Sequence, residues 1–138
     1  ERATVVVTEQ GVDVVIDGVR SHHTLAALGY GGAASATAAA VHPAGALVAL
    51  GGDDARVRLY ELPAMQLTGV LENGRSATTA LAFSPDGTLL AAGESSGKIP
   101  VYDVASGALR LNQWVFHTAR VQAIAWAPDG RHAASASL

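Results

Sequence analysis

The sequence contains no cysteine, and this absence excludes several kinds of structure and chemistry. A disulfide framework, a thiolate metal site and a cysteine nucleophile are all ruled out. Lysine occurs once, at Lys98, and the eight arginines are scattered, so the concentrated positive charge of a nucleic-acid-binding protein is missing. The lack of cysteine also agrees with a reducing compartment.

Long apolar runs are missing as well. No run approaches the roughly 18 consecutive apolar residues of a membrane-spanning helix, and no basic region followed by a hydrophobic segment begins at Glu1. We therefore expect neither a membrane span nor a signal peptide. Because 49% of the 138 residues are hydrophobic and only 15% are charged, the chain is expected to fold around a core rather than to be disordered.

A repeated pattern of short apolar runs and tight turns dominates the sequence. From Thr78 to Gly107, three alternating apolar runs are separated by two turn signals, which is typical of successive antiparallel strands. The segment Phe83-Ser84-Pro85-Asp86-Gly87 has counterparts 42 residues upstream, at 41–45, and 43 residues downstream, at 126–130. A repeat of about 40–45 residues is typical of the four-stranded blade of a β-propeller. The sequence therefore predicts an all-β propeller.

Alternating and β-branched runs locate the individual strands. Residues 3–8 and 12–17 predict a hairpin formed by the second and third strands of a blade whose first strand is absent, with a turn at 18–20 and an outer strand at 24–30. The strands expected after it are 36–41, 47–51, 57–61, 66–71, 78–83, 89–93, 99–103, 109–115 and 121–126, with one more near the end of the chain.

The alanine-rich stretch 33–40 presents a conflict between local propensity and the repeat. Alanine at this density favours a helix. The repeat, however, aligns residues 36–41 with 78–83 and 121–126, which are all expected to be inner strands packed around a narrow channel. We therefore predict a strand here.

The repeats divide the chain into four units, namely a blade fragment at 1–30, blades at 31–74 and 75–117, and a second blade fragment at 118–138. A closed propeller needs at least four complete blades, and an open array leaves apolar blade faces exposed. We expect an incomplete propeller of about three and a half blades. Either the chain is a piece of a longer polypeptide, or several copies close one ring.

The repeated turn and blade residues are expected to be structural. Proline presets φ, aspartate bonds the local backbone, and glycine adopts a positive φ. His117 precedes an inner strand, where we expect it to bond to Ser135 or Ser137. The full structural set is Pro85, Asp86, Gly87, Pro128, Asp129, Gly130, His117, Tyr60 and Tyr102.

No catalytic, metal or cofactor site is predicted. Adjacent residues of a strand point to opposite faces, so His22 and His23 cannot chelate one ion from a regular strand. The glycine-rich segment 29–32 lacks the Lys-Ser/Thr and the helix that a phosphate loop requires. The serines lack a Gly-x-Ser-x-Gly motif, and the inner strands offer only apolar residues, Thr and one Gln.

A cluster of charged residues is expected at one rim of the propeller. Asp53 and Asp54 lie in the hairpin between the second and third strands of a blade, and Glu94 lies in the equivalent hairpin of the next blade. Glu72 and Arg75 lie in the connection between these blades and share the rim. These residues are either solvated turns or a contact patch for a protein partner.

The repeat units resemble WD repeats. The segments 57–61 and 100–103 stand where that family has its Trp-Asp ending, although tyrosine replaces tryptophan in both, and Phe116-His117 stands for its Gly-His. The family's buried His-Ser-Asp-Trp network is therefore complete nowhere in this chain. The resemblance implies a WD-repeat β-propeller that acts as a scaffold for other proteins.

A narrower resemblance, to the carboxy-terminal propeller of the actin-interacting protein 1 family, rests on 4–9, 48–53, 57–60, 114–121 and 125–130. That resemblance implies a cytoplasmic, cytoskeletal, non-enzymatic protein whose partners are actin filaments and cofilin, and which promotes cofilin-dependent filament disassembly. It carries no binding residue onto this chain. The alternative is a generic WD-repeat scaffold for another multiprotein assembly.

Overall fold

The computed structural model describes residues 3–8, 11–25, 27–28, 36–62, 64–72, 76–111, 119–130 and 132–137. Within them the chain forms strands and turns and no α-helix. The strands are β1 (Ala3–Thr8), β2 (Gly11–Ile16), β3 (Val19–Thr24), β4 (Ala36–Val41), β5 (Leu47–Gly52), β6 (Val57–Glu61), β7 (Gln66–Leu71), β8 (Thr78–Phe83), β9 (Leu89–Glu94), β10 (Val101–Asp103), β11 (Leu109–Leu111), β12 (Val121–Trp126) and β13 (Ala133–Ser137).

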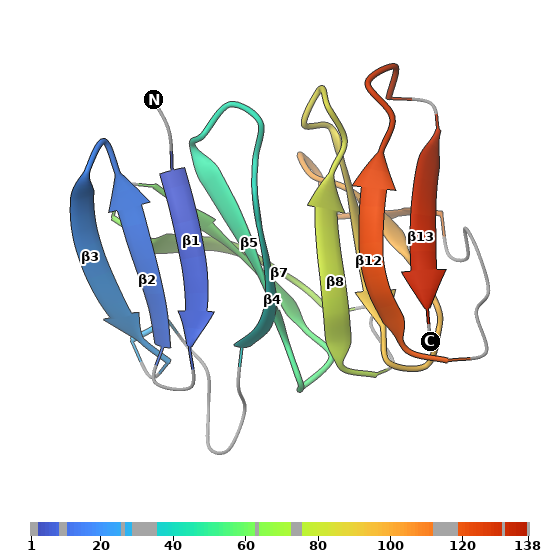
Figure 1. Cartoon of the computed structure of the whole chain (residues 1–138), viewed down its shortest axis with the longest axis horizontal. Helices are drawn as coiled ribbons and strands as arrows, with labels where there is room; N and C mark the ends of the chain where they lie inside the picture. The colour runs from blue at the N-terminus through green and yellow to red at the C-terminus, as the bar shows by residue number, and fades with distance from the viewer. Residues whose placement is uncertain are drawn as a thin grey trace.

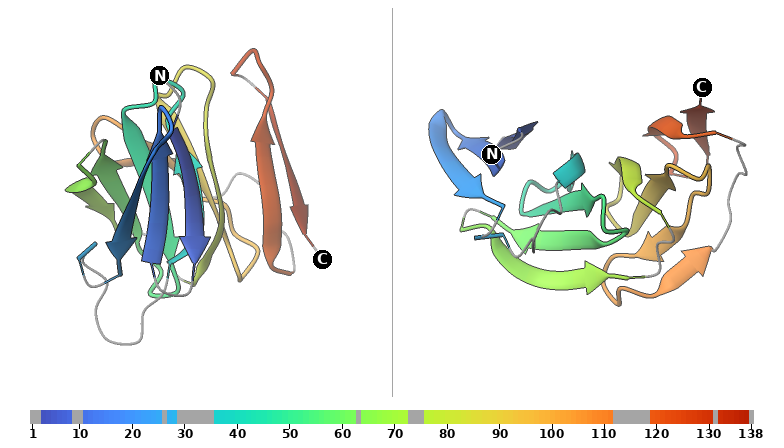
Figure 2. Two further views of the ribbon diagram at one scale, coloured as in Figure 1. Left: turned by 60° about the vertical axis from the view of Figure 1, so that its left-hand side comes forward. Right: turned by 90° about the horizontal axis from the view of Figure 1, so that it is seen from below.

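The strands form four antiparallel sheets in chain order. The sheets are β1-β2-β3, β4-β5-β6-β7, β8-β9-β10-β11 and β12-β13. They stand side by side in Figure 1 and follow an arc when seen from below in Figure 2. Strand β8 packs against β4 on one side and against β12 on the other, so these strands line the inside of the arc. The predicted inner strands 36–41, 78–83 and 121–126 coincide with β4, β8 and β12.

The core lies in layers between neighbouring sheets. Val48, Leu50 and Tyr60 pack toward the first sheet, against Val12 and Val14. The opposite face of the same four-stranded sheet packs its Ala49 and Leu59 toward the next sheet. This two-sided packing follows from the alternation of side chains along a strand, because both faces of an internal blade are buried.

A β-bulge recurs at one place in each inner strand. The register shifts between Ala36 and Ala38, between Thr78 and Ala80, and between Val121 and Ala123. A bulge re-aims the side chain of the extra residue. The Oγ1 atoms of the extra residues Thr37 and Thr79 each donate a hydrogen bond of 2.5 Å to a backbone carbonyl of the next inner strand, at Thr78 and Val121 respectively. These bonds tie adjacent blades together at the inside of the arc.

The first sheet departs from the prediction at its outer strand. That strand is β3, at Val19–Thr24, and not the segment 24–30; the turn lies at Asp17 and Gly18, where both residues have positive φ. The run 19–24 carries an arginine and two histidines, so its composition did not predict a strand. It forms one because it pairs with β2. In Figure 1, β1 points opposite to β8 and β12, which is the direction expected of a second strand.

The alanine-rich segment is a strand over 36–41, as predicted from the repeat, while 33–35 lie outside the described residues. The outer strand predicted at 109–115 is described only as β11, with 112–118 outside the described part. The unit boundaries 1–30, 31–74, 75–117 and 118–138 stay predictions.

Candidate functional site

The turn of Pro85, Asp86 and Gly87 is held by side-chain hydrogen bonds. Asp86 accepts bonds from the backbone N–H of Thr88 at 3.0 Å, from the Ser84 hydroxyl at 2.7 Å and from the Thr88 hydroxyl at 2.8 Å. These donors lower the pKa of Asp86 to about 2. Gly87 has a φ of 77°, and its carbonyl oxygen lies 3.1 Å from Nε2 of His42, which directly follows β4 of the neighbouring sheet. The turn thus also links two blades.

In the equivalent turn after β12, the aspartate bonds a histidine, His132. Oδ2 of Asp129 lies 3.0 Å from Nδ1 of His132, and the Asp129 carboxylate accepts a bond from the His132 backbone N–H at 3.3 Å. Gly130, after Pro128 and Asp129, has a φ of 71°. These contacts lie within the turn.

The two equivalent tyrosines are buried in separate core layers, each with 1% of its surface exposed. Tyr60 donates a hydrogen bond from its hydroxyl to the backbone carbonyl of Leu28, in the connection that follows the first sheet. Burial raises the pKa of Tyr102 to about 12, and the nearby Glu94 carboxylate adds to this shift. Both residues pack neighbouring blades together.

The histidine pair of β3 is divided between the two faces of its sheet. Nδ1 of His22 lies 2.5 Å from Oδ1 of Asp13, whereas Nε2 of His23 lies 3.1 Å from the Ser21 hydroxyl. Arg20 also bonds Asp13, and the pKa of Asp13 is lowered, first by the Arg20 bond and then by the His22 bond. No group of three or more possible metal ligands occurs among the described residues. His117 lies outside them.

The charged rim is formed where the β5–β6 hairpin meets the end of β7. Asp54 forms a two-pronged pair with Arg58, at 2.8 Å from Nη2 and 3.4 Å from Nη1. The Arg58 side chain is only 5% exposed, and that of Asp54 is 22% exposed. Burial by itself would raise the pKa of Asp54, but bonds from Arg58 and from the Arg56 backbone outweigh it and lower the pKa. Asp54 therefore organises the hairpin.

The outward-facing part of this rim consists of Asp53 and Glu72. Asp53 is exposed at the tip of the hairpin, which also contains the half-buried Ala55 with a φ of 67°. Glu72 is 65% exposed and lies 3.5 Å from Nε of Arg56. The hairpin and the β7–β8 connection lie at the same end of the sheet because β5, β6 and β7 pair antiparallel. Arg75, in that connection, is outside the described residues.

Glu94 differs from the other predicted rim residues because it is buried, with 2% of its surface exposed. Its Oε1 accepts hydrogen bonds from the Ser76 hydroxyl at 3.2 Å and the Ser96 hydroxyl at 3.5 Å. Ser76 is 18 residues away in the sequence, so no local pattern revealed this burial. In the described structure Glu94 closes a turn instead of offering a surface for a partner.

Residues 39–129 match the family model of the anaphase-promoting complex subunit 4 WD40 domain. The chain belongs to the WD40-repeat family. The structure is similar to a chain in the crystal structure of a mitotic checkpoint complex, with a TM-score of 0.84 and 20% sequence identity. The match covers 98% of this WD40 chain and 41% of the chain in the complex. The prediction of an all-β, incomplete WD-repeat propeller is thereby confirmed.

Three relatives of this WD40 chain are similar in sequence. WD repeat-containing protein 1 is 39% identical in Mus musculus and 41% identical in Bos taurus, in each case over 101 residues. Actin-interacting protein 1-2 of Arabidopsis thaliana is 34% identical over 104 residues. These matches cover 72–74% of this chain but only 17% of each relative. Within the described residues, no helix is long and apolar enough to cross a membrane.

Proposed function

We propose that this protein is a non-enzymatic, cytoplasmic regulator that binds actin filaments and promotes their disassembly together with cofilin. The observation that carries this proposal is the 34% identity over 104 residues to a protein named actin-interacting protein 1-2. It agrees with the resemblance drawn from the sequence motifs. A regulator of this kind needs no chemistry on a substrate, because preferential binding to the cofilin-decorated filament shifts the equilibrium toward breakage.

The contact surface we propose is the rim at the β5–β6 hairpin and the β7–β8 connection. Asp53 and Glu72 are exposed there, and Arg75 belongs to the same connection. Asp54 shapes the hairpin through Arg58 and so supports the surface indirectly. Exposed charged groups at a rim influence the rate of association and the choice of partner more than the total affinity.

The experiment is a filament-disassembly assay in which actin remaining in the pellet is followed with and without cofilin. We expect the protein to reduce pelletable actin only when cofilin is present. The double variant Asp53→Asn/Glu72→Gln should weaken this effect, whereas the matched variant Asp17→Asn/Glu61→Gln, which removes the same charge from exposed residues at the opposite end of the strands, should not. Disassembly that is absent, or independent of cofilin, with a folded protein would contradict the proposal.

A second candidate function is a scaffold for another multiprotein assembly, favoured by the match to the anaphase-promoting complex subunit 4 WD40 domain. This alternative predicts no effect on actin filaments. It also predicts that a pull-down with the folded protein recovers a defined set of partners. The Asp53→Asn/Glu72→Gln variant should recover a different set.

A further inference from the structure

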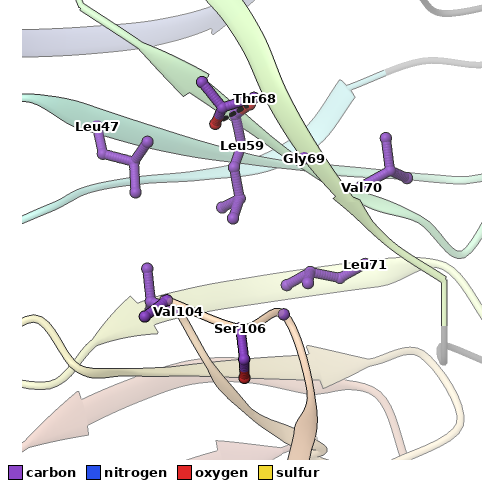
Figure 3. Close-up of a pocket in the computed structure, with 10 residues that line it drawn as sticks. Leu47, Leu59, Thr68, Gly69, Val70, Leu71, Val104 and Ser106 are labelled. Carbon is purple, nitrogen blue, oxygen red and sulfur yellow. Dashed lines mark hydrogen bonds between the residues drawn. The ribbon is translucent and has the colours of Figure 1, made fainter.

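A groove whose walls combine aliphatic side chains with polar groups opens between the second and third sheets (Figure 3). It has a volume of about 360 Å³, and Leu47, Leu59 and Leu71 line one side while Val104 and Ser106 of the β10–β11 turn line the other. A leucine or phenylalanine side chain fits easily within this volume. Both walls belong to this chain, so the groove does not depend on other blades.

The groove runs along β7, whose outer edge is open. β7 is the last strand of its sheet, and no described strand pairs with its outer side. Its sequence, Gln-Leu-Thr-Gly-Val-Leu, contains neither charge nor proline, and Leu67 and Val70 are 45% and 38% exposed. The outer strands of the other sheets with three or four strands differ, since β3 carries an arginine and two histidines and β11 carries an arginine. Charges and proline are the usual protection of an edge against strand addition.

Gly69 provides an independent indication of an occupant. It lies in the middle of β7, its φ is outside the left-handed region, and the nearest atom to a Cβ built there is Cδ1 of Leu59 at 4.0 Å. Neither the backbone conformation nor the packing of this chain therefore requires glycine. Glycine within a strand weakens it and often marks either a bulge or a place where a ligand or another backbone approaches closely. The register does shift at Thr68, beside Gly69, but Gly69 has no positive φ that would require glycine at this bulge.

The charges around the edge indicate the chemistry of that occupant. Glu61 is exposed opposite Gln66, where β7 begins. The exposed Glu72, which lies 3.5 Å from Nε of Arg56, directly follows the last residue of β7. An edge strand of six residues is thus bracketed by two carboxylates. An extended segment with basic residues at its ends and an apolar side chain at its centre complements both the charge and the groove.

We propose that β7 binds an extended peptide segment of a partner protein by strand addition, with one apolar side chain in the groove beside Gly69 and lysine or arginine near Glu61 or Glu72. Main-chain hydrogen bonds to the open edge supply affinity, and the groove supplies specificity. The Thr68 hydroxyl already donates to the Leu59 carbonyl at 3.2 Å, within the sheet, so it does not occupy the outer edge. This site shares Glu72 with the rim proposed for actin, but the groove and Gly69 do not belong to that rim.

The test begins with selection of a displayed library of random eight-residue peptides on the folded protein. We expect enrichment of sequences with Leu, Ile, Val or Phe beside Lys or Arg. A labelled peptide from this set should bind Gly69→Leu, whose new side chain fills the groove, with an affinity at least ten times lower than that for the original protein. Its affinity for Val19→Leu, which places the same leucine side chain on the exposed strand β3, should be unchanged. Methylating the central backbone nitrogens of the peptide should also abolish binding.

Hydrogen exchange locates the site without relying on a variant. Bound peptide should slow exchange of amides in 66–71 and leave those of β11 unchanged. The proposal is overturned if no sequence is enriched, if the selected peptides bind Gly69→Leu equally well, or if protection appears elsewhere. It is also overturned if the protein alone forms a dimer that Gly69→Leu abolishes, because the occupant is then a second copy. None of these readouts depends on actin.

Discussion

The close approach of β9 to β12 gives a stability prediction that can be worked from distances. A Cβ built on Gly93 lies 2.5 Å from Cγ1 and 2.8 Å from Cβ of Val121, which is fully buried. Carbon atoms at this separation overlap, and Cβ of Val121 cannot move without shifting β12 itself. Overpacking of this kind costs about 1–3 kcal/mol. The lower conformational entropy of unfolded alanine offsets about 0.4–1 kcal/mol, so we expect Gly93→Ala to destabilise the protein by about 1–2 kcal/mol.

The matched control for this variant is Gly69→Ala, because its Cβ meets nothing closer than 4.0 Å. That substitution should leave stability unchanged or raise it by about 0.5 kcal/mol. The free energy of unfolding is measured by urea denaturation, with circular dichroism and tryptophan fluorescence required to give the same transition.

A double-mutant cycle identifies the overlap as the cause. Val121→Ala alone removes two buried methyl groups and should cost about 1.6 kcal/mol at about 0.8 kcal/mol for each. It also removes the atom nearest to the new methyl group at position 93, so the double variant should be about 1 kcal/mol more stable than the sum of the single effects predicts. Strict additivity, or a Gly93→Ala protein as stable as the original, would refute the reasoning.

Two further predictions concern the carboxylates. Asp54→Ala leaves the buried Arg58 guanidinium without its carboxylate and should cost about 3 kcal/mol in urea denaturation, at the low end for a buried pair because Asp54 is 22% exposed. Asp53→Ala, at the exposed tip of the same hairpin, should cost less than about 1 kcal/mol, because interactions of exposed charges are weak. The pKa of Asp86 is lowered from 3.8 to about 2, so its stabilising effect is complete above pH 4 and is lost as the pH falls toward 2. The Tm of Asp86→Ala should therefore fall less than that of the original protein over this pH range, and parallel pH profiles would contradict the assignment.

The sequence indicated where the candidate rim lies, but not which of its residues are buried or paired. Hairpin order and the repeat locate Asp53 and Glu72 at one end of the blades, because antiparallel strands alternate in direction. Burial of Glu94 depends on Ser76, and the pairing of Asp54 depends on the turn that brings Arg58 beside it. The number of residues between such partners depends on the length of the loop that joins them. No sequence motif with a fixed spacing therefore encodes these contacts.

The sequence by itself determined the all-β repeat, the three inner strands and the turns between them. These features follow from local alternation of side chains, from proline and glycine chemistry and from the period of about 42 residues. Only the tertiary structure decided that 19–24 forms the outer strand of the first sheet, that the bulged threonines bind the next blade, and that Gly69 opens a groove. These outcomes depend on neighbouring strands and blades, which supply hydrogen bonds and packing that no short segment contains.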